Sequence, residues 1–305
     1  MSTLTHKSRL TRFPGGEGPH ALRWMSDVSE LCKARITFMV LITTAVGFLL
    51  GWRGPLNLLY FLQALCGTGL AASGAAALNQ VFEVELDGRM RRTCNRPLPG
   101  RRMTLDEGLI IGIFCSVAGI LWLSFAINFY SAILCAITIG TYVFVYTPLK
   151  RVTTLNTIVG AIPGALPPVI GWTAARGHAD FASWVLFAIM FLWQMPHFLA
   201  ISWLYREDYK RAGFVMLTGS DPDCRVTGRQ ALIYTMGLAS VSLLPAVLQL
   251  TTFWYLPIAA MTGGYFIWMA FRFAITGTEQ AARKLFVASI VYLPVTLAAI
   301  VFTRL

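Results

Sequence analysis

The sequence predicts an all-α membrane protein, a bundle of nine transmembrane helices with a cytoplasmic N-terminus. Its composition is the first reason: of 305 residues, 56% are hydrophobic and 13% charged, and the mean hydropathy is +0.62. The second is a series of apolar runs, several near or above the ~20 residues that a helix needs to cross a bilayer. Because lipid offers the backbone no hydrogen-bond partners, helices are the expected spanning form.

Nine apolar runs mark the expected spans. The first, 36–52, is interrupted only by threonines and glycines, which helices in lipid tolerate. The fifth contains Pro163, Pro167 and Pro168, so we expect this helix to kink or break beside a cavity or packed neighbours. Residues 1–35 then form a cytoplasmic N-terminal segment and residues 36–305 one intramembrane domain. The predicted spans are 36–52, 56–78, 106–127, 129–147, 154–174, 181–203, 231–250, 252–271 and 285–303.

Basic residues are distributed unevenly between the two sides of this bundle. With the N-terminus inside, 22 of the 25 lysines and arginines are cytoplasmic, and only Arg53, Arg176 and Arg304 lie outside. This bias is the expected orientation signal. Of the 14 acidic residues, only Asp180 lies outside, although carboxylates contribute little to orientation. The net charge of +11 therefore indicates orientation and an anionic partner at the inner face. The sequence contains no nucleic-acid-binding motif.

The stretch NQVFEVELDGRMRRTCNRPLPGRR, residues 79–102, gathers charge in an otherwise apolar chain. Asn79, Glu83 and Asp87 are spaced four apart, so on a helix they drift only ~40° per step and share one face. Oxygen ligands in a row suit a hard cation such as Mg²⁺, which uses one or two carboxylates, waters and phosphate oxygens. The stretch therefore predicts a magnesium site at the mouth of the bundle.

Arginines follow these oxygen ligands. Gly88 is a plausible helix end, and Thr104 and Glu107 have the spacing of a capping box that starts the next helix. Between them lie Arg92 and Arg96, whose guanidinium groups suit the oxygens of a phosphate. The alternative for this loop is a network of surface salt bridges.

A second charged loop follows the sixth span. The run WQMPHFLAISWLYREDYKRAGFVML, residues 193–217, carries Arg206, Glu207 and Asp208. Lys150 and Arg151, at the end of the fourth span, lie on the same side; alone they would be topology determinants, but with two acidic motifs facing them they are candidate diphosphate ligands. Together the loops predict a two-sided clamp for a metal-bridged diphosphate.

These motifs resemble those of a known family. The pattern NxxxExxxDxxMxRTxxRPLP, here from Asn79 to Pro99, resembles the first motif of the intramembrane prenyltransferases of the UbiA type. Glu83, the run WQMPHF…REDY…G…ML and the run YTPLKRVTTLNTIVGAIPGALPPVIGW are similar to the branch of that family that farnesylates heme. The resemblance covers nearly all the chain beyond residue 30. It marks residues 36–305 as a prenyltransferase domain.

The resemblance implies a reaction. A farnesyl group would pass from farnesyl diphosphate to the 2-vinyl group of heme B, giving heme O and diphosphate, with Mg²⁺ as the required ion. The candidate catalytic residues are Asn79, Glu83, Asp87 and Asp208, and, from its position in the sequence, His197. The implied metal ligands are Asn79, Glu83, Asp87, Glu207 and Asp208. The implied diphosphate ligands are Arg92, Arg96, Lys150, Arg151 and Arg206.

One departure from the family pattern affects the second motif. The wider family carries carboxylates four residues apart in both acidic motifs, whereas Leu204 stands four residues before Asp208 here. Asp208 is therefore carried over ahead of Glu207, and the number of metal ions is left open.

His197 lies in the sixth span, beside Pro196 and about ten residues before Asp208. Ten helical residues rise ~15 Å, so its side chain should lie below the metal site, where an acceptor ring would sit. Three roles remain open. It is an axial ligand to heme iron, a base near the vinyl group, or a structural histidine bonded to the carbonyl that Pro196 frees.

Two other functions remain as alternatives. One is prenylation of an aromatic acid in quinone biosynthesis. The other is transport, since intramembrane charge and broken helices also mark transporters, although the acids here lie at helix ends rather than at the midplane. The chain length and short N-terminal segment favour a bacterial inner membrane, with the mitochondrial inner membrane as the alternative. Heme A synthase and terminal-oxidase assembly factors are the candidate protein partners.

Overall fold

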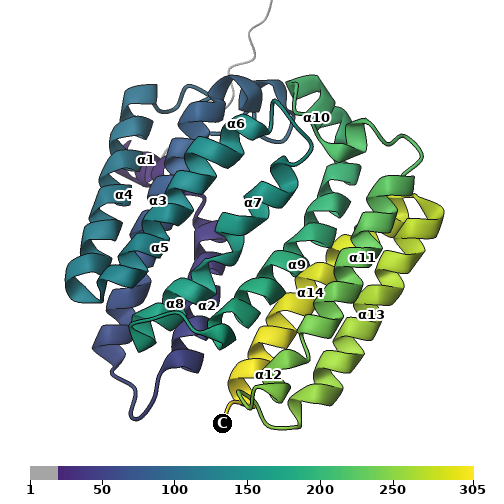
Figure 1. Ribbon diagram of the computed structural model, residues 1–305. Coiled ribbons are helices and arrows are strands. Elements are labelled where there is room, and N and C mark those ends of the chain that lie inside the picture. The colour runs from purple at the N-terminus through teal and green to yellow at the C-terminus, as the bar shows by residue number, and fades with distance from the viewer. Residues whose placement is uncertain (1–19) are drawn as a thin grey trace, which may run out of the picture.

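The computed structural model describes residues 20–305, and Figure 1 shows this part as a bundle of helices. Within it, nine spans are long and apolar enough to cross a membrane, which confirms the predicted fold class. Their orientation in the membrane stays a prediction, and residues 1–19 of the expected N-terminal segment lie outside the described residues. The spans are α2 (Ala34–Gly51), α3 (Leu58–Arg89), α4 (Leu105–Ala126), α5 (Phe129–Gly140) with η1 (Thr141–Tyr146) and α6 (Thr147–Leu149), α7 (Asn156–Ala165) with α8 (Pro167–Arg176), α9 (Phe181–Leu204), α11 (Arg225–Val241) with α12 (Leu244–Val247), α13 (Tyr255–Thr276) and α14 (Glu279–Phe302).

Several helices begin earlier or end later than the apolar runs. Helix α14 starts at Glu279 because the Thr278 side chain caps it by accepting from the Ala281 amide. Helix α11 starts at Arg225, where the buried Asp221 carboxylate accepts from the Thr227 amide at 2.7 Å. Thr104 and Glu107 form the predicted capping box of α4. Hydropathy marks only the lipid-crossing part of a helix, whereas caps fix its ends.

The fifth span is broken as predicted. Helix α7 ends at Ala165 and α8 begins at Pro167, so Leu166 separates two short helices. From α9, the buried Gln194 side chain donates to the Ala161 carbonyl of α7 at 3.2 Å. A neighbouring helix therefore contributes a polar group to the broken span.

Glycines let α8 approach α2 at backbone distance. A Cβ atom on Gly171 would lie 1.9 Å from the Thr44 carbonyl oxygen, and one on Gly47 would lie 1.9 Å from the Pro168 carbonyl oxygen. Only residues without a side chain fit such a crossing. In Figure 1 the elements up to α8 form one group and α9 to α14 the other.

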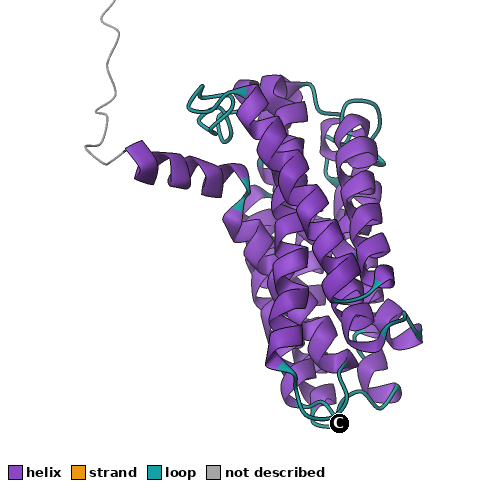
Figure 2. Cartoon of the chain, turned by 90° about the vertical axis from the view of Figure 1, so that its left-hand side faces the viewer, coloured by secondary structure: helices purple, strands orange, loops and turns teal. Residues whose placement is uncertain are grey.

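Helix α1 (His20–Leu31) lies outside the bundle and runs away from its side in Figure 2. Its C-terminal carbonyls, those of Glu30 and Leu31, accept from the buried Gln80 side chain of α3 at 3.0 and 2.8 Å. Lys33 follows in the left-handed region, with φ 48° and ψ 53°, which non-glycine residues seldom adopt. This corner turns the chain into α2 and brings Lys33 against α3.

The crossing of α2 and α8 generates a stability prediction. We expect Gly171→Ala to lower the melting temperature in detergent, because the new methyl group collides with backbone and overpacking costs about 1–3 kcal/mol or more. Gly264→Ala in α13 is the matched control, since a Cβ there would meet nothing within 4 Å. Thermal unfolding followed by tryptophan fluorescence makes the comparison. Equal melting temperatures for the two variants would contradict the close crossing.

Candidate active site

The site is built on the last turns of α3, where this helix continues beyond its apolar part. Asn79, Glu83 and Asp87 have exposed fractions of 0%, 4% and 3%, so all three face the interior, as their spacing predicted. Burying two carboxylates without partners would be very costly. The partners of these groups therefore define the site.

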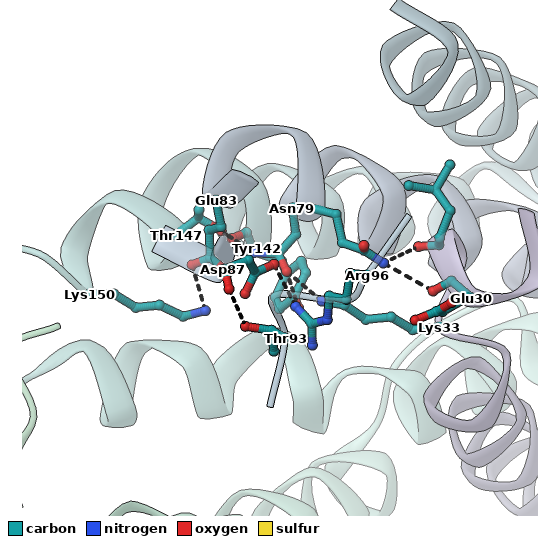
Figure 3. A network of polar contacts seen from close by, with 12 residues as sticks. Glu30, Lys33, Asn79, Glu83, Asp87, Thr93, Arg96, Tyr142, Thr147 and Lys150 are labelled. Carbon is teal, nitrogen blue, oxygen red and sulfur yellow. Dashed lines mark hydrogen bonds and ion pairs between the residues drawn. The ribbon is translucent and has the colours of Figure 1, made fainter. Parts of the chain in front are cut away.

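Each of the three oxygen-bearing side chains is paired with one cation from another part of the chain (Figure 3). Lys33 comes from the corner before α2, Arg96 from the loop after α3, and Lys150 from the end of the fourth span. The Nζ–Oε1 distance is 2.7 Å for Lys150 and the guanidinium–Oδ2 distance is 2.6 Å for Arg96. The pairs are Lys33 with Asn79, Lys150 with Glu83, and Arg96 with Asp87.

The orientation of Asn79 is set by the fourth span. Its amide nitrogen donates to Thr147 Oγ1 at 3.0 Å, and Thr147 Oγ1 donates to the Tyr142 carbonyl at 2.9 Å. The amide oxygen of Asn79 therefore faces Lys33 and the Tyr142 hydroxyl. Tyr142 lies in the π-helical stretch η1, a feature that is frequent at functional sites.

Aromatic rings enclose Lys150. Its Nζ lies 4.5 Å from the ring centroid of Tyr146 and 5.6 Å from that of Phe214, distances at which an ammonium is attracted to a ring face. Burial alone would lower the pKa of Lys150. The interactions with Tyr146 and Glu83 are stronger, so the pKa of Lys150 is raised above its usual value. The carbonyl of Lys150 accepts from the Val215 amide at 2.7 Å, which ties the second charged loop to the fourth span.

The second loop contributes less to this cluster than the sequence predicted. It contains α10 (Arg206–Ala212), where Asp208 pairs with Arg211 at 3.1 Å and Glu207 is exposed, with 76% of its side chain accessible. Arg206 donates to Glu279 at 3.3 Å. Among the described residues, no hydrogen bond or ion pair joins these side chains to Asn79, Glu83 or Asp87.

Two further arginines that were predicted as diphosphate ligands lie outside the paired cluster. Arg92 is exposed, and its guanidinium lies 5.5 Å from the ring centroid of Tyr205, so it bridges the two loops. Arg151 is exposed and makes no ion pair with any described residue. The paired cluster is thus formed by the end of α3, the corner at Lys33, the first loop and the end of the fourth span. The second loop contacts it at Lys150.

The side chain of His197, on α9, lies against α14. Its Nδ1 is 2.7 Å from Ser289 Oγ, and its ring packs against Trp193 and Phe286, with centroids 4.8 and 5.1 Å away. The partner is thus Ser289 rather than the carbonyl that Pro196 frees. Ser289 Oγ donates to the Phe286 carbonyl at 2.6 Å, so Nδ1–H must donate to Ser289 and Nε2 keeps its lone pair.

Lys33 is the site residue that sequence analysis missed, because it was counted only as a basic residue of the N-terminal segment. Burial, with the charges of Arg96 and Lys150, lowers its pKa to about 7, although Glu83 and Asp87 act in the opposite direction. One feature of the sequence could have pointed to Lys33. It stands directly before the first apolar run, and so at the same predicted end of the bundle as Asn79. Its pairing follows from the corner after α1, which the sequence did not reveal.

The oxygen donors of the cluster fit a magnesium ion that is shared with a phosphate. Within residues 20–305 no group of three or more histidine, cysteine, aspartate or glutamate side chains is arranged to hold a metal. Mg²⁺ needs only one or two carboxylates when waters and phosphate oxygens complete its shell. Glu83 and Asp87, with the Asn79 amide oxygen, supply that minimum on one helix face.

Known proteins resemble this chain over nearly its whole length. The model of the UbiA prenyltransferase family matches residues 40–293. A protoheme IX farnesyltransferase of Solibacter usitatus is 45% identical, over 92% of this chain and 99% of that protein. The mitochondrial protoheme IX farnesyltransferase of Homo sapiens is 40% identical, over 88% of this chain and 60% of that protein.

Solved structures share the fold. A structure described as a digeranylgeranylglyceryl phosphate synthase in membranes matches with a TM-score of 0.78 and 17% identity, over 92% of this chain and 98% of that one. A UbiA homologue of Archaeoglobus fulgidus bound to GPP and Mg²⁺ matches with a TM-score of 0.63 and 13% identity, over 90% of this chain and 99% of that one. At these identities the likeness establishes the fold alone.

The environment of Lys33 generates a titration prediction. The chain has five lysines, at positions 7, 33, 150, 210 and 284, so ¹³C-methylated amines give few NMR signals. We expect one lysine to titrate near pH 7, charged below and neutral above, because burial disfavours its ammonium form. Lys33→Gly should remove that signal while preserving the left-handed backbone. If every lysine titrated above about pH 9, close to the ordinary lysine range, the predicted environment would be wrong.

Proposed function

Because the chain belongs to the UbiA prenyltransferase family, we propose that it transfers a farnesyl group from farnesyl diphosphate to the 2-vinyl group of heme B. The observation that carries the proposal is the buried face of Asn79, Glu83 and Asp87 with its ring of cations. That face supplies oxygens for a metal and cations for a diphosphate. The acceptor is inferred from full-length relatives that carry the name protoheme IX farnesyltransferase.

The proposed reaction balances with one water. The bond between farnesyl C1 and the diphosphate oxygen breaks, and diphosphate leaves with the electron pair. The terminal vinyl carbon of heme B bonds to C1, which leaves a positive charge on the adjacent carbon. Water adds there and loses a proton, giving a hydroxyethylfarnesyl side chain. Charge therefore develops on the diphosphate first, and stabilising it is the task of the cluster.

We infer that Asn79, Glu83 and Asp87 hold Mg²⁺, which, when bound, offsets the negative charge of the leaving diphosphate. Lys150 and Arg96 are then the diphosphate ligands closest to the metal, since both already contact the carboxylates. Arg92 is placed to reach a diphosphate from the side of Tyr205.

The second loop has an outer role in this proposal. Of its two acidic residues, we prefer Asp208 to Glu207 as a metal ligand, because Asp208 is largely buried and Glu207 points to solvent. Helices α6 and α10 lie at the same end of the bundle in Figure 1, and Arg151 follows α6 while Arg206 begins α10. Both arginines remain candidate outer contacts to the diphosphate.

The apolar bundle serves the other half of the reaction. A farnesyl tail gains about 0.8 kcal/mol for each CH₂ group that leaves water. His197 lies in the membrane-spanning part of α9, and its Nε2 lone pair suits either heme iron or the proton that the adding water releases. We infer that the heme ring lies beside α9.

We place this multi-pass membrane protein in a bacterial inner membrane, with its charged end toward the cytoplasm. The sequence supports this orientation, since 22 of its 25 basic residues fall in segments predicted to be cytoplasmic. Heme A synthase or terminal-oxidase assembly factors would receive the product. Membership of an enzyme family argues against transport, and the names of the relatives favour heme over an aromatic acid as the acceptor.

The purified chain should convert heme B and farnesyl diphosphate to heme O only with Mg²⁺. Glu83→Gln and Asp87→Asn keep the side-chain shape and remove the charge, so we expect each to lower turnover about a hundredfold or more while the protein stays folded. Glu85→Gln, on the exposed face of α3, is the matched control and should retain activity. Near-normal turnover of the first two variants at saturating Mg²⁺ would exclude the proposed site.

His197→Ala tests the acceptor side. If His197 binds heme iron, the variant should bind heme more weakly and shift its absorption spectrum, while its affinity for farnesyl diphosphate stays the same. His178→Ala, exposed at the opposite end of the bundle, is the control. Lost turnover with an unaltered spectrum would assign His197 as a base instead. Full activity with an unaltered spectrum would leave it a structural role.

A further inference from the structure

The amide oxygen of Asn79 and one oxygen of each carboxylate are already held by cations of the chain itself. The ammonium of Lys33 bonds to Asn79 Oδ1, Lys150 lies 2.7 Å from Glu83 Oε1, and Arg96 contacts Asp87. A magnesium ion on these oxygens would sit about 2.0–2.1 Å from them, which brings it against the lysine nitrogens. Like charges at such a distance in a buried site repel strongly. Metal and lysines therefore compete for the side chains of Asn79 and Glu83.

The net charge of the cluster indicates when a metal ion can displace the lysines. Two carboxylates, Glu83 and Asp87, face three cations, so the cluster carries about one positive charge when both lysines are protonated. Mg²⁺ alone would raise this to about three positive charges in a largely buried place. A diphosphate that arrives with the metal brings about three negative charges and restores neutrality. The cluster is thus built for the metal and the diphosphate together.

The side chain of Lys33 is well placed to move from Asn79 to a bound diphosphate. Its neighbours in the chain are the last turn of α1 and the first turn of α2, and its left-handed backbone holds it at this corner. Gln80 fixes the corner to α3 through the carbonyls of Glu30 and Leu31. The side chain itself is a four-carbon stem that ends in a rotating ammonium. A rigid corner with a movable tip suits an exchange of partners.

We propose that Lys33 and Lys150 are exchange cations, which hold the oxygens of Asn79 and Glu83 in the free protein and pass to diphosphate oxygens when the metal takes their place. The metal then binds tightly only together with a diphosphate. Lys33 becomes a substrate-contacting residue of the site. The proposal rests on the proposed function for the identity of the diphosphate ligand.

The test measures Mn²⁺ binding to the full chain in nanodiscs, by EPR of the free ion, with and without unreactive farnesyl thiodiphosphate. In the unmodified chain, the analogue should tighten Mn²⁺ binding by about 5- to 150-fold, the usual range of coupling between two ligands. Lys33→Met should bind Mn²⁺ alone more tightly and the analogue more weakly, so the coupling factor falls. Lys150→Met should do the same.

Three further variants make the result specific. Lys33→Gly removes the side chain but accommodates the left-handed backbone, which covers the case in which Lys33→Met fails to fold. Lys33→Arg should restore most of the coupling. Arg35→Met changes an exposed basic residue two positions away and should leave both affinities unchanged.

Two results would overturn the proposal, and they differ in meaning. If the lysine variants bind Mn²⁺ alone no more tightly than the unmodified chain, the exchange is wrong while the proposed function stands. If the unmodified chain binds neither Mn²⁺ nor the analogue, the proposed function itself fails.

Discussion

Pairing of buried carboxylates with cations holds the charged end of this protein together. Glu83 and Asp87 are almost fully buried, and a buried charge without a partner destabilises a fold severely. Their partners, with Lys33 on Asn79, come from segments far apart in the chain: the corner before α2, the loop after α3 and the end of the fourth span. Because all three cations contact one helix face, these segments converge there. The same convergence produces a site in which oxygens and cations alternate.

Much of the bundle can be understood as support for that convergence. Glycines bring α2 and α8 into backbone contact, so the corner that carries Lys33 leads into a closely packed helix. The π-helical stretch places Tyr142 beside Asn79, and Thr147, the first residue of α6, follows it there. The second loop packs Phe214 beside Lys150 and a backbone amide on its carbonyl. The apolar spans below offer a prenyl tail the dry environment that a carbocation requires.

Local rules predicted much of the site. A four-residue spacing places Asn79, Glu83 and Asp87 on one face of any helix, so their common burial followed from sequence alone. The capping box at Thr104 and the break near Pro167 are likewise local. Lys33 could not be found this way, because its role depends on a corner fixed by Gln80, about 50 residues away along the chain. For the same reason the sequence placed Glu207 with the metal ligands, whereas its side chain points to solvent.

A structure of the chain with Mg²⁺ and unreactive farnesyl thiodiphosphate would show directly whether metal and lysines exchange places. We expect a metal about 2.0–2.1 Å from oxygens of Glu83 and Asp87, with diphosphate oxygens completing its shell. We also expect Lys33 and Lys150 to have left Asn79 and Glu83 for the diphosphate. A metal bound elsewhere, or an intact Lys150–Glu83 pair beside a bound diphosphate, would contradict it.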